Sequence, residues 1–215
     1  MIHEEILSEK QLLLLRRLTS LPDKSYMAGG TALALQIGHR TSLDFDFFTP
    51  LRFESQQVLS SLESVSEELK VERIAKDTLI LEIDGVSFSL FYYPYSLIGP
   101  LVIFENVKLA SIEDIAAMKM VAISTRGKRR DFIDMHYLLQ KLSLREIMKL
   151  TLKKFPSYQP MVILKGLIYF EDAEKDDVSR KIQIFDEDLS WEKVKKELYE
   201  EVEKYQSELV KKNQF

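Results

Sequence analysis

The chain has 215 residues, of which 46% are hydrophobic and 30% charged, and its formal net charge is −4. This composition is typical of a globular protein and excludes a disordered chain, while the absence of Cys excludes disulfides, thiolate zinc sites and a Cys nucleophile. No apolar run approaches the ~20 residues of a membrane helix, and the acidic, polar N-terminus is unlike a signal peptide, so we expect a cytoplasmic protein with no membrane contact.

The first half of the chain alternates between helix and strand patterns. Pro22 ends the first helix, Gly29 and Gly30 form a turn after a short extended stretch at 26–28, and Gly38 suits a helix C-cap. The dipeptide Asp84-Gly85 is a strong hairpin signal. The expected helices are 4–20, 31–37 and 53–70, and the expected strands are 42–48, 71–76, 78–83 and 86–93.

The two faces of the expected hairpin differ in polarity. One face is uniformly apolar and must be core, with Leu79, Leu81, Ile83, Val86, Phe88 and Leu90. The opposite face is mixed and suits the wall of a site, with Thr78, Ile80, Glu82, Asp84, Ser87 and Ser89.

Helical patterns dominate from Ser111 onward. We expect a helix to Arg126, a loop over 127–130, a helix over 131–141 and a last amphipathic helix from about Ser190. The fold class is therefore α+β: a small mixed sheet with flanking helices over 1–110, followed by a helical region over 111–215. The two parts are also compatible with one globular unit.

Asp44 and Asp46 are the first candidates for chemistry. Carboxylates at positions i and i+2 of a strand point to the same face, where they repel one another unless a divalent cation lies between them. Such a pair suits Mg²⁺ or Mn²⁺, especially where substrate phosphates complete the shell. Taken alone, the pattern also fits two aspartates that face solvent on an edge strand.

Gly29, Gly30 and Thr31 precede this strand and open a helix. Glycines allow a ligand to approach the backbone closely, and the amides at a helix N-terminus favour a phosphate. An ordinary strand-to-helix turn would have the same residues. Together with the aspartates, the turn indicates a site for a metal and a triphosphate.

A second candidate group lies between residues 114 and 139. Lys119 and Arg126 are seven positions apart and share a helix face, with the small Ala122 between them, so a phosphate-bearing ligand has room. The alternative is two solvated bases. Asp131 and Asp134 begin the next helix, where acids also complement the helix dipole.

Both regions resemble the AbiEii/AbiGii toxin family of nucleotidyltransferases, whose core is similar to that of DNA polymerase beta. The matching segments are MAGGTALALQIGHRTSLDFDFF and DIAAMKMVAISTRGKRRDFIDMHYLL. The resemblance implies metal-dependent transfer of a nucleotide from a nucleoside triphosphate to an RNA end, above all the tRNA 3′ terminus. It also implies a toxin restrained by a cognate antitoxin, in a toxin–antitoxin or phage-defence system.

The resemblance also implies roles for individual residues. Metal binding falls to Asp44 and Asp46, and catalysis to these two with Lys119 and Asp134. Lys119 would neutralise charge on the transferred phosphoryl group, and Asp134 would position Lys119 or the acceptor. Nucleotide binding falls to Gly29, Gly30, Thr31, Arg40, Arg126 and Asp131, while His39 beside a glycine is more typical of a structural histidine.

One position departs from the pattern of polymerase-beta-like enzymes. A third metal-binding carboxylate is expected on a neighbouring strand, where this chain has Ser89, and Glu82 on the same hairpin face is a possible substitute. A degenerate member that binds nucleotide or a partner without transfer is therefore one alternative. An enzyme that modifies a protein or a small molecule is another, although the basic run of Arg126, Lys128, Arg129 and Arg130 favours a polyanionic acceptor.

Overall fold

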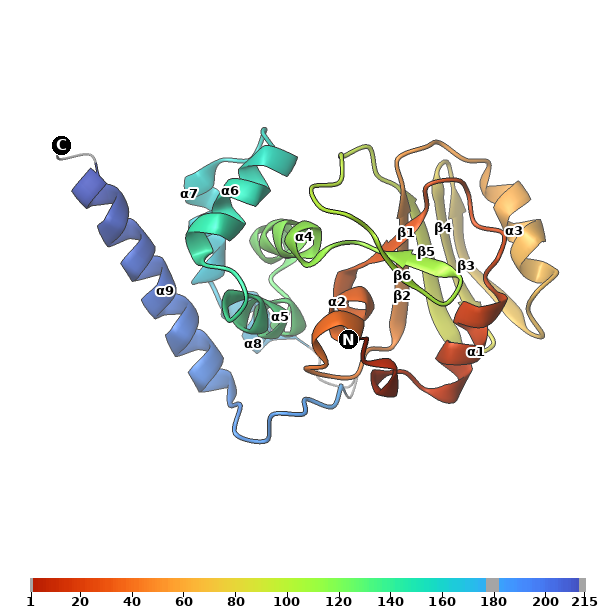
Figure 1. Ribbon diagram of the computed structural model, residues 1–215, viewed down its shortest axis with the longest axis horizontal. Coiled ribbons are helices and arrows are strands. Elements are labelled where there is room, and N and C mark those ends of the chain that lie inside the picture. The colour runs from red at the N-terminus through yellow and green to blue at the C-terminus, as the bar shows by residue number, and fades with distance from the viewer. Residues whose placement is uncertain (1, 177–181, 213–215) are drawn as a thin grey trace. The chain divides into compact units, whose positions relative to one another are not determined.

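The computed structural model describes residues 2–176 and 182–212. The chain divides into two compact units, Met1–Ser111 and Ile112–Phe215, and the described part of each is presented by itself. The first contains the strands and the second contains helices, as Figure 1 shows. This composition confirms the expected α+β class.

The first unit is built on a mixed, seven-stranded sheet in the order β3-β4-β5-β2-β1-β7-β6 among the described residues. β2 and β5 are parallel, as are β1 and β7, and the other neighbours are antiparallel. The strands are β1 (Tyr26–Ala28), β2 (Asp44–Thr49), β3 (Leu69–Ala75), β4 (Thr78–Ile83), β5 (Val86–Tyr92), β6 (Val102–Phe104) and β7 (Val107–Leu109).

Among the described residues of this unit there are three α-helices. They are α1 (Glu9–Arg17), α2 (Gly29–Ile37) and α3 (Ser55–Glu63). The helix expected over 4–20 is interrupted, because the Ser8 side chain caps α1 by accepting from the Gln11 amide, and a short 3₁₀ turn over Glu4–Ile6 precedes it. Gly38 is left-handed, with φ of 65°, and ends α2 as predicted.

The helix expected over 53–70 is too long. α3 ends at Glu63, and residues from Leu69 onward are strand β3, which pairs with β4 from Leu69↔Ile83 to Ala75↔Thr78. The Glu- and Lys-rich sequence around residue 68 favours a helix locally, but pairing with the hairpin overrides that preference. The hairpin itself is confirmed: Asp84 and Gly85 both have positive φ, 52° and 81°, as a two-residue primed turn requires.

Alternation along the strands separates a core face from a polar face of the sheet. Phe45 and Phe47 of β2 and Phe88 of β5 have at most 1% of their surface exposed. Asp44 and Asp46 alternate with them and are only half-buried. The core face includes every hairpin residue expected there, so Leu79, Leu81, Ile83, Val86, Phe88 and Leu90 are all buried.

The second unit is helical in the part that the structure describes. Its helices are α4 (Ile112–Arg126), α5 (Arg129–Leu139), α6 (Leu144–Lys154), α7 (Pro160–Leu167), α8 (Glu171–Glu174) and α9 (Trp191–Lys212). α4 packs against α5, α6 and α7, and the long α9, blue in Figure 1, packs against the same three. Val194, Leu198 and Val202 of α9 are buried as its apolar stripe predicts, whereas Leu209 near its end is 37% exposed.

Candidate functional site

The aspartate pair lies on β2, in the middle of the sheet. Asp46 pairs in register with Ala28 of β1 on one side and with Ser89 of β5 on the other. The Ser89 hydroxyl donates to Asp46 Oδ1 at 2.7 Å. Ser89 therefore occupies the place beside Asp46 where the sequence suggests a third carboxylate, and it contributes a neutral group.

The glycine turn lies directly against the Asp46 carboxylate. Gly29 begins α2 with φ of 74°, and a Cβ atom at this position would come within 2.9 Å of Asp46 Oδ2. A side chain at Gly29 would thus be strained and would also clash with the carboxylate. The preceding Ala28 provides no side-chain cap, so backbone amides of the first turn of α2 remain available beside Asp46.

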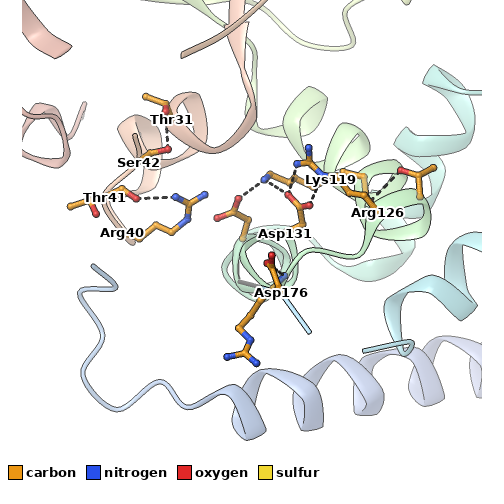
Figure 2. Close-up of polar contacts among 12 residues, drawn as sticks. Thr31, Arg40, Thr41, Ser42, Lys119, Arg126, Asp131 and Asp176 are labelled. Carbon is orange, nitrogen blue, oxygen red and sulfur yellow. Dashed lines mark hydrogen bonds and ion pairs between the residues drawn. The ribbon is translucent and has the colours of Figure 1, made fainter. Parts of the chain in front are cut away.

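Arg40 lies next to Gly30. A Cβ atom at Gly30 would come within 2.5 Å of Arg40 Nη2, so the glycine leaves the space that the guanidinium occupies. Arg40 is buried and its Nη1 donates to the Thr41 carbonyl at 2.9 Å (Figure 2). A cation is therefore held at the start of α2, where the helix dipole already favours an anion.

Thr31 uses its side chain within the fold. Its hydroxyl contacts Ser42 Oγ at 2.8 Å (Figure 2) and the backbone carbonyl of Asp44, and the residue is 1% exposed. The Gln11 side chain also donates to the Ser42 carbonyl, at 2.8 Å. These contacts fix the segment before Asp44 to α1 and α2, so the expected nucleotide contact of Thr31 is left to its backbone amide.

Glu82 lies on β4, which is separated from β2 by β5. It pairs in register with Ser87, which in turn pairs with Asp44. Its Oε1 atom is 2.8 Å from Lys70 Nζ, and the hydrogen bonds to Glu82 and Glu68 raise the pKa of Lys70. The proposal that Glu82 substitutes for a third ligand stays a prediction.

The polar face fits a divalent cation only in part. Among residues 2–176 and 182–212, no group of three or more His, Asp or Glu is close enough to hold a metal. Two carboxylates remain at Asp44 and Asp46, which is the number that Mg²⁺ commonly takes from a protein when substrate phosphates supply the other ligands. The donor set therefore fits a cation that binds together with a triphosphate.

The second unit holds a buried cluster of opposite charges. Lys119 of α4 contacts Asp131 Oδ1 at 2.8 Å and also Asp134, and both aspartate side chains are fully buried. Arg126 Nε donates to Asp131 Oδ2 at 2.8 Å (Figure 2). Lys119 and Arg126 thus share one helix face, as their spacing predicted, and Asp131 bridges them.

Asp131 is ionised by its neighbours. Burial alone would raise its pKa, but the Lys119 ammonium and the Arg126 guanidinium outweigh that cost and hold the pKa of Asp131 below its ordinary value. The carboxylate therefore stays charged and fixes both cations. This bridging role goes beyond the complement to the helix dipole that the sequence indicated for Asp131.

The basic run, which extends from the end of α4 to the start of α5, is only partly exposed. Lys128 is exposed. The Arg129 guanidinium, in contrast, donates to the Ala173 carbonyl at 3.2 Å and lies 5.1 Å from the ring centre of Trp191. The Arg129 amide donates to Asp176 at 2.9 Å. Arg129 is thus used in packing the second unit, and Lys128 is the more accessible cation.

Two features escaped the sequence reasoning. Lys154 of α6 and Asp114 of α4 form an ion pair at 2.7 Å with both side chains fully buried, although they are 40 positions apart. Phe48 and Phe91 continue the polar face of the sheet as neighbours in register, next to Asp46 and Ser89. Only the second had a signal in the sequence, namely the alternation of β2 beyond Asp46.

This chain is similar in sequence to known proteins. A family model described as "Nucleotidyl transferase AbiEii toxin, Type IV TA system" matches residues 13–211. An uncharacterized protein of Aquifex aeolicus, aq_aa25, is 38% identical over 192 residues, which cover 84% of this chain and 87% of that protein.

Two solved structures from Helicobacter pylori have a similar fold. A putative nucleotidyltransferase is 17% identical, with a TM-score of 0.59 over 95% of this chain and 98% of that one. JHP933 is 19% identical, with a TM-score of 0.57 over 100% and 97%. None of the helices in the described part of the chain has the length and apolar character needed to span a membrane.

Proposed function

Because the chain belongs to the AbiEii nucleotidyl transferase toxin family of type IV toxin–antitoxin systems, we propose that it transfers a nucleotide from a nucleoside triphosphate to an RNA end. The family makes it a nucleotidyltransferase toxin with a nucleotide substrate and an antitoxin partner. The RNA acceptor, with the tRNA 3′ terminus as the first candidate, and the dependence on Mg²⁺ or Mn²⁺ are the parts that we add.

The contact between Gly29 and Asp46 carries this proposal. It puts an uncapped helix N-terminus, which favours phosphate, against one of two carboxylates that favour a divalent cation. A triphosphate held by the amides at Gly29 and Gly30 would have its reacting phosphate beside Asp46. Arg40, held over Gly30, would add a positive charge to the same phosphates.

In the reaction, a hydroxyl oxygen of the acceptor bonds to the α-phosphorus of the triphosphate. The bond from that phosphorus to the bridging oxygen breaks, pyrophosphate leaves with the electron pair, and the hydroxyl proton passes to solvent. Asp44 and Asp46 would hold the cation, which supplies Lewis acidity and lowers the pKa of the attacking hydroxyl. Ser89 would orient Asp46 through its 2.7 Å hydrogen bond.

We assign Lys119 the role of neutralising charge on the transferred phosphoryl group. Asp134 and Asp131 hold its ammonium in place, so their role is to position it. Arg126 shares Asp131 with Lys119 and is half-exposed, which suits a contact with nucleotide phosphate. We keep the cytoplasm as the proposed location of the reaction.

The test is to incubate the purified protein with total RNA, Mg²⁺ and each labelled triphosphate in turn. We expect label in RNA from at least one triphosphate, and loss of labelling when Asp44 is changed to Asn. Glu72→Gln is a matched control, since Glu72 is an exposed acid on edge strand β3. Triphosphate binding without labelling of any RNA would overturn the acceptor and favour the degenerate alternative, and labelling of protein would favour a protein acceptor.

A further inference from the structure

The polar face of the sheet continues from the aspartates into a strip of aromatic side chains. Asp46 of β2 and Ser89 of β5 are neighbours in register. Two positions further along each strand are Phe48 on β2 and Phe91 on β5, which are also neighbours in register. Tyr93 and Tyr95 extend the strip beyond the end of β5. We define the aromatic strip as Phe48, Phe91, Tyr93 and Tyr95.

Each ring of the strip contacts at least one other ring of the strip. The ring centres are 5.8 Å apart for Phe48 and Phe91, 5.1 Å for Phe48 and Tyr93, and 4.9 Å for Tyr93 and Tyr95. All four residues retain partial exposure. The same strands provide an internal comparison, because Phe45, Phe47 and Phe88 on the opposite face are at most 1% exposed.

The position of the strip relative to Asp46 is set by the strand register. Along β1, Tyr26 pairs with Phe48 and Ala28 pairs with Asp46, and the glycine turn follows Ala28. The glycine turn and the aromatic strip therefore lie on opposite sides of the Asp46 row, and Phe48 is about 7 Å from Asp46 along the strand.

The geometry of in-line displacement indicates which substrate group lies at the strip. The attacking and leaving oxygens lie on opposite sides of the phosphorus that is transferred. If the leaving pyrophosphate lies at the glycine turn and the α-phosphate beside Asp46, the attacking hydroxyl arrives from the side of Phe48. The ring faces there suit nucleobases, which stack on aromatic side chains with little sequence preference.

We propose that the aromatic strip is a stacking platform for the terminal bases of a single-stranded RNA acceptor. This inference rests on the proposed function, since it places the acceptor relative to the triphosphate. The strip has four rings over two segments, whereas an incoming nucleotide has a single base. The strip therefore fits an acceptor strand better than it fits the triphosphate.

The test measures affinity for a labelled single-stranded oligoribonucleotide without triphosphate, so that no turnover occurs. Phe91→Leu and Tyr95→Leu keep apolar bulk but remove a ring face, whereas Phe91→Tyr and Tyr95→Phe keep the ring. We expect the two Leu variants to bind about 5- to 150-fold more weakly, which corresponds to ~1–3 kcal/mol per stacked base. The ring-retaining variants should bind like the wild type.

Two controls separate stacking from other effects. Tyr199→Leu removes an aromatic ring that is 49% exposed on α9 and should leave RNA affinity unchanged. Because stacking releases few counterions, the Leu variants should keep the wild-type salt dependence of binding. Thermal unfolding shows whether each variant is folded at the assay temperature.

Three outcomes would overturn the inference. They are unchanged RNA affinity in folded Leu variants, equal weakening in the ring-retaining variants, and weakened affinity for nucleoside triphosphate in place of RNA. The last outcome would assign the strip to the incoming base. Failure of the proposed function is distinguishable, because it would abolish labelling of RNA by the wild type while the effect of the ring variants on binding stayed intact.

Discussion

Two pairs of closely spaced aspartates, one on β2 and one on α5, differ in their surroundings. Asp131 and Asp134 on α5 are fully buried, and both contact Lys119. Asp44 and Asp46 on β2 are only half-buried, and the hydrogen-bond partner of Asp46 is the neutral Ser89 hydroxyl.

The difference supports the proposal that the pair on β2 binds a ligand. A buried carboxylate needs a compensating charge, and α4 supplies it for the pair on α5. At Asp46 the fold leaves negative charge next to an uncapped helix N-terminus. An external cation and a phosphate are the groups that would gain most from that arrangement.

The largest expected effect is on the pair on β2. Asp46→Asn should lower nucleotide transfer by about 10³-fold, or ~4 kcal/mol of transition-state stabilisation, because a metal ligand is lost. The free energy of unfolding should stay the same or rise slightly, since removing one carboxylate relieves repulsion with Asp44. Labelled-nucleotide transfer and urea unfolding measure the two quantities.

The control for Asp46→Asn is Glu72→Gln, which removes an exposed acid from β3 and should change neither quantity. Full activity of Asp46→Asn with unchanged metal dependence would contradict the assignment of the pair on β2.

For the pair on α5, unlike the pair on β2, we expect a substitution to lower the stability of the fold as well as the activity. Asp131→Asn should lower the free energy of unfolding by about 3 kcal/mol, because it leaves the buried Lys119 with one carboxylate fewer. Transfer should also fall, since Lys119 and Arg126 lose the group that positions them. A variant as stable as the wild type would show that the cluster is not a structural element.

The pH dependence of this effect follows from the lowered pKa of Asp131. A group whose pKa is lower in the folded state stabilises the fold above its unfolded pKa, about 3.9 for Asp, and loses that contribution as the pH falls through the folded value. The difference in unfolding free energy between wild type and Asp131→Asn should therefore be constant from pH 7 to 5 and shrink below pH 4. Urea unfolding across this range provides the measurement. A difference that grows on acidification would contradict a lowered pKa of Asp131.

Local patterns predicted one pair well and the other only in part. The period-two alternation around Phe45 was sufficient to place Asp44 and Asp46 on one face, because strand geometry fixes it. The seven-residue spacing predicted that Lys119 and Arg126 share a face, but not that buried acids hold both. That contact depends on how α4 and α5 pack, which no local pattern encodes.

Contacts between elements also explain what the sequence did not predict about Ser89 and β3. The hairpin turn fixes the register of β4 and β5, so Ser89 was correctly put on the polar face. Its position beside Asp46 requires the parallel pairing of β2 with β5, a contact between residues 43 positions apart. Tertiary pairing also limits the helix expected over 53–70, because residues from Leu69 onward pair with β4 as strand β3.

A smaller effect is expected when a substitution on β5 adds a third carboxylate beside the pair on β2. Ser89→Asp should tighten Mn²⁺ binding in the absence of nucleotide by on the order of tenfold, or ~1.4 kcal/mol, because the Ser89 hydroxyl lies beside Asp46. Ser89→Asn is the neutral control and should leave Mn²⁺ affinity unchanged. Calorimetric titration of both variants measures the effect.

Glu82→Gln complements this experiment. If Glu82 binds the metal, transfer should be abolished, and if its contact with Lys70 is its only role, activity should persist. Tight metal binding that neither Glu82→Gln nor Ser89→Asp alters would mean that the cation does not bind at this part of the sheet.

The smallest expected effect concerns the basic run that precedes the pair on α5. Lys128 is exposed, so a phosphate contact by this residue should contribute about 0.7 to the slope of log affinity for single-stranded RNA against log salt. Lys128→Ala should reduce the slope by that amount and leave triphosphate affinity unchanged.

Arg129→Ala should instead keep the slope and lower the free energy of unfolding by about 1 kcal/mol, because Arg129 lies over Trp191 and donates to Ala173. Lys193→Ala, an exposed base on α9, is the control for charge alone. Equal slope changes in Lys128→Ala and Lys193→Ala would show that RNA senses only overall charge, and would leave no contact specific to the start of α5.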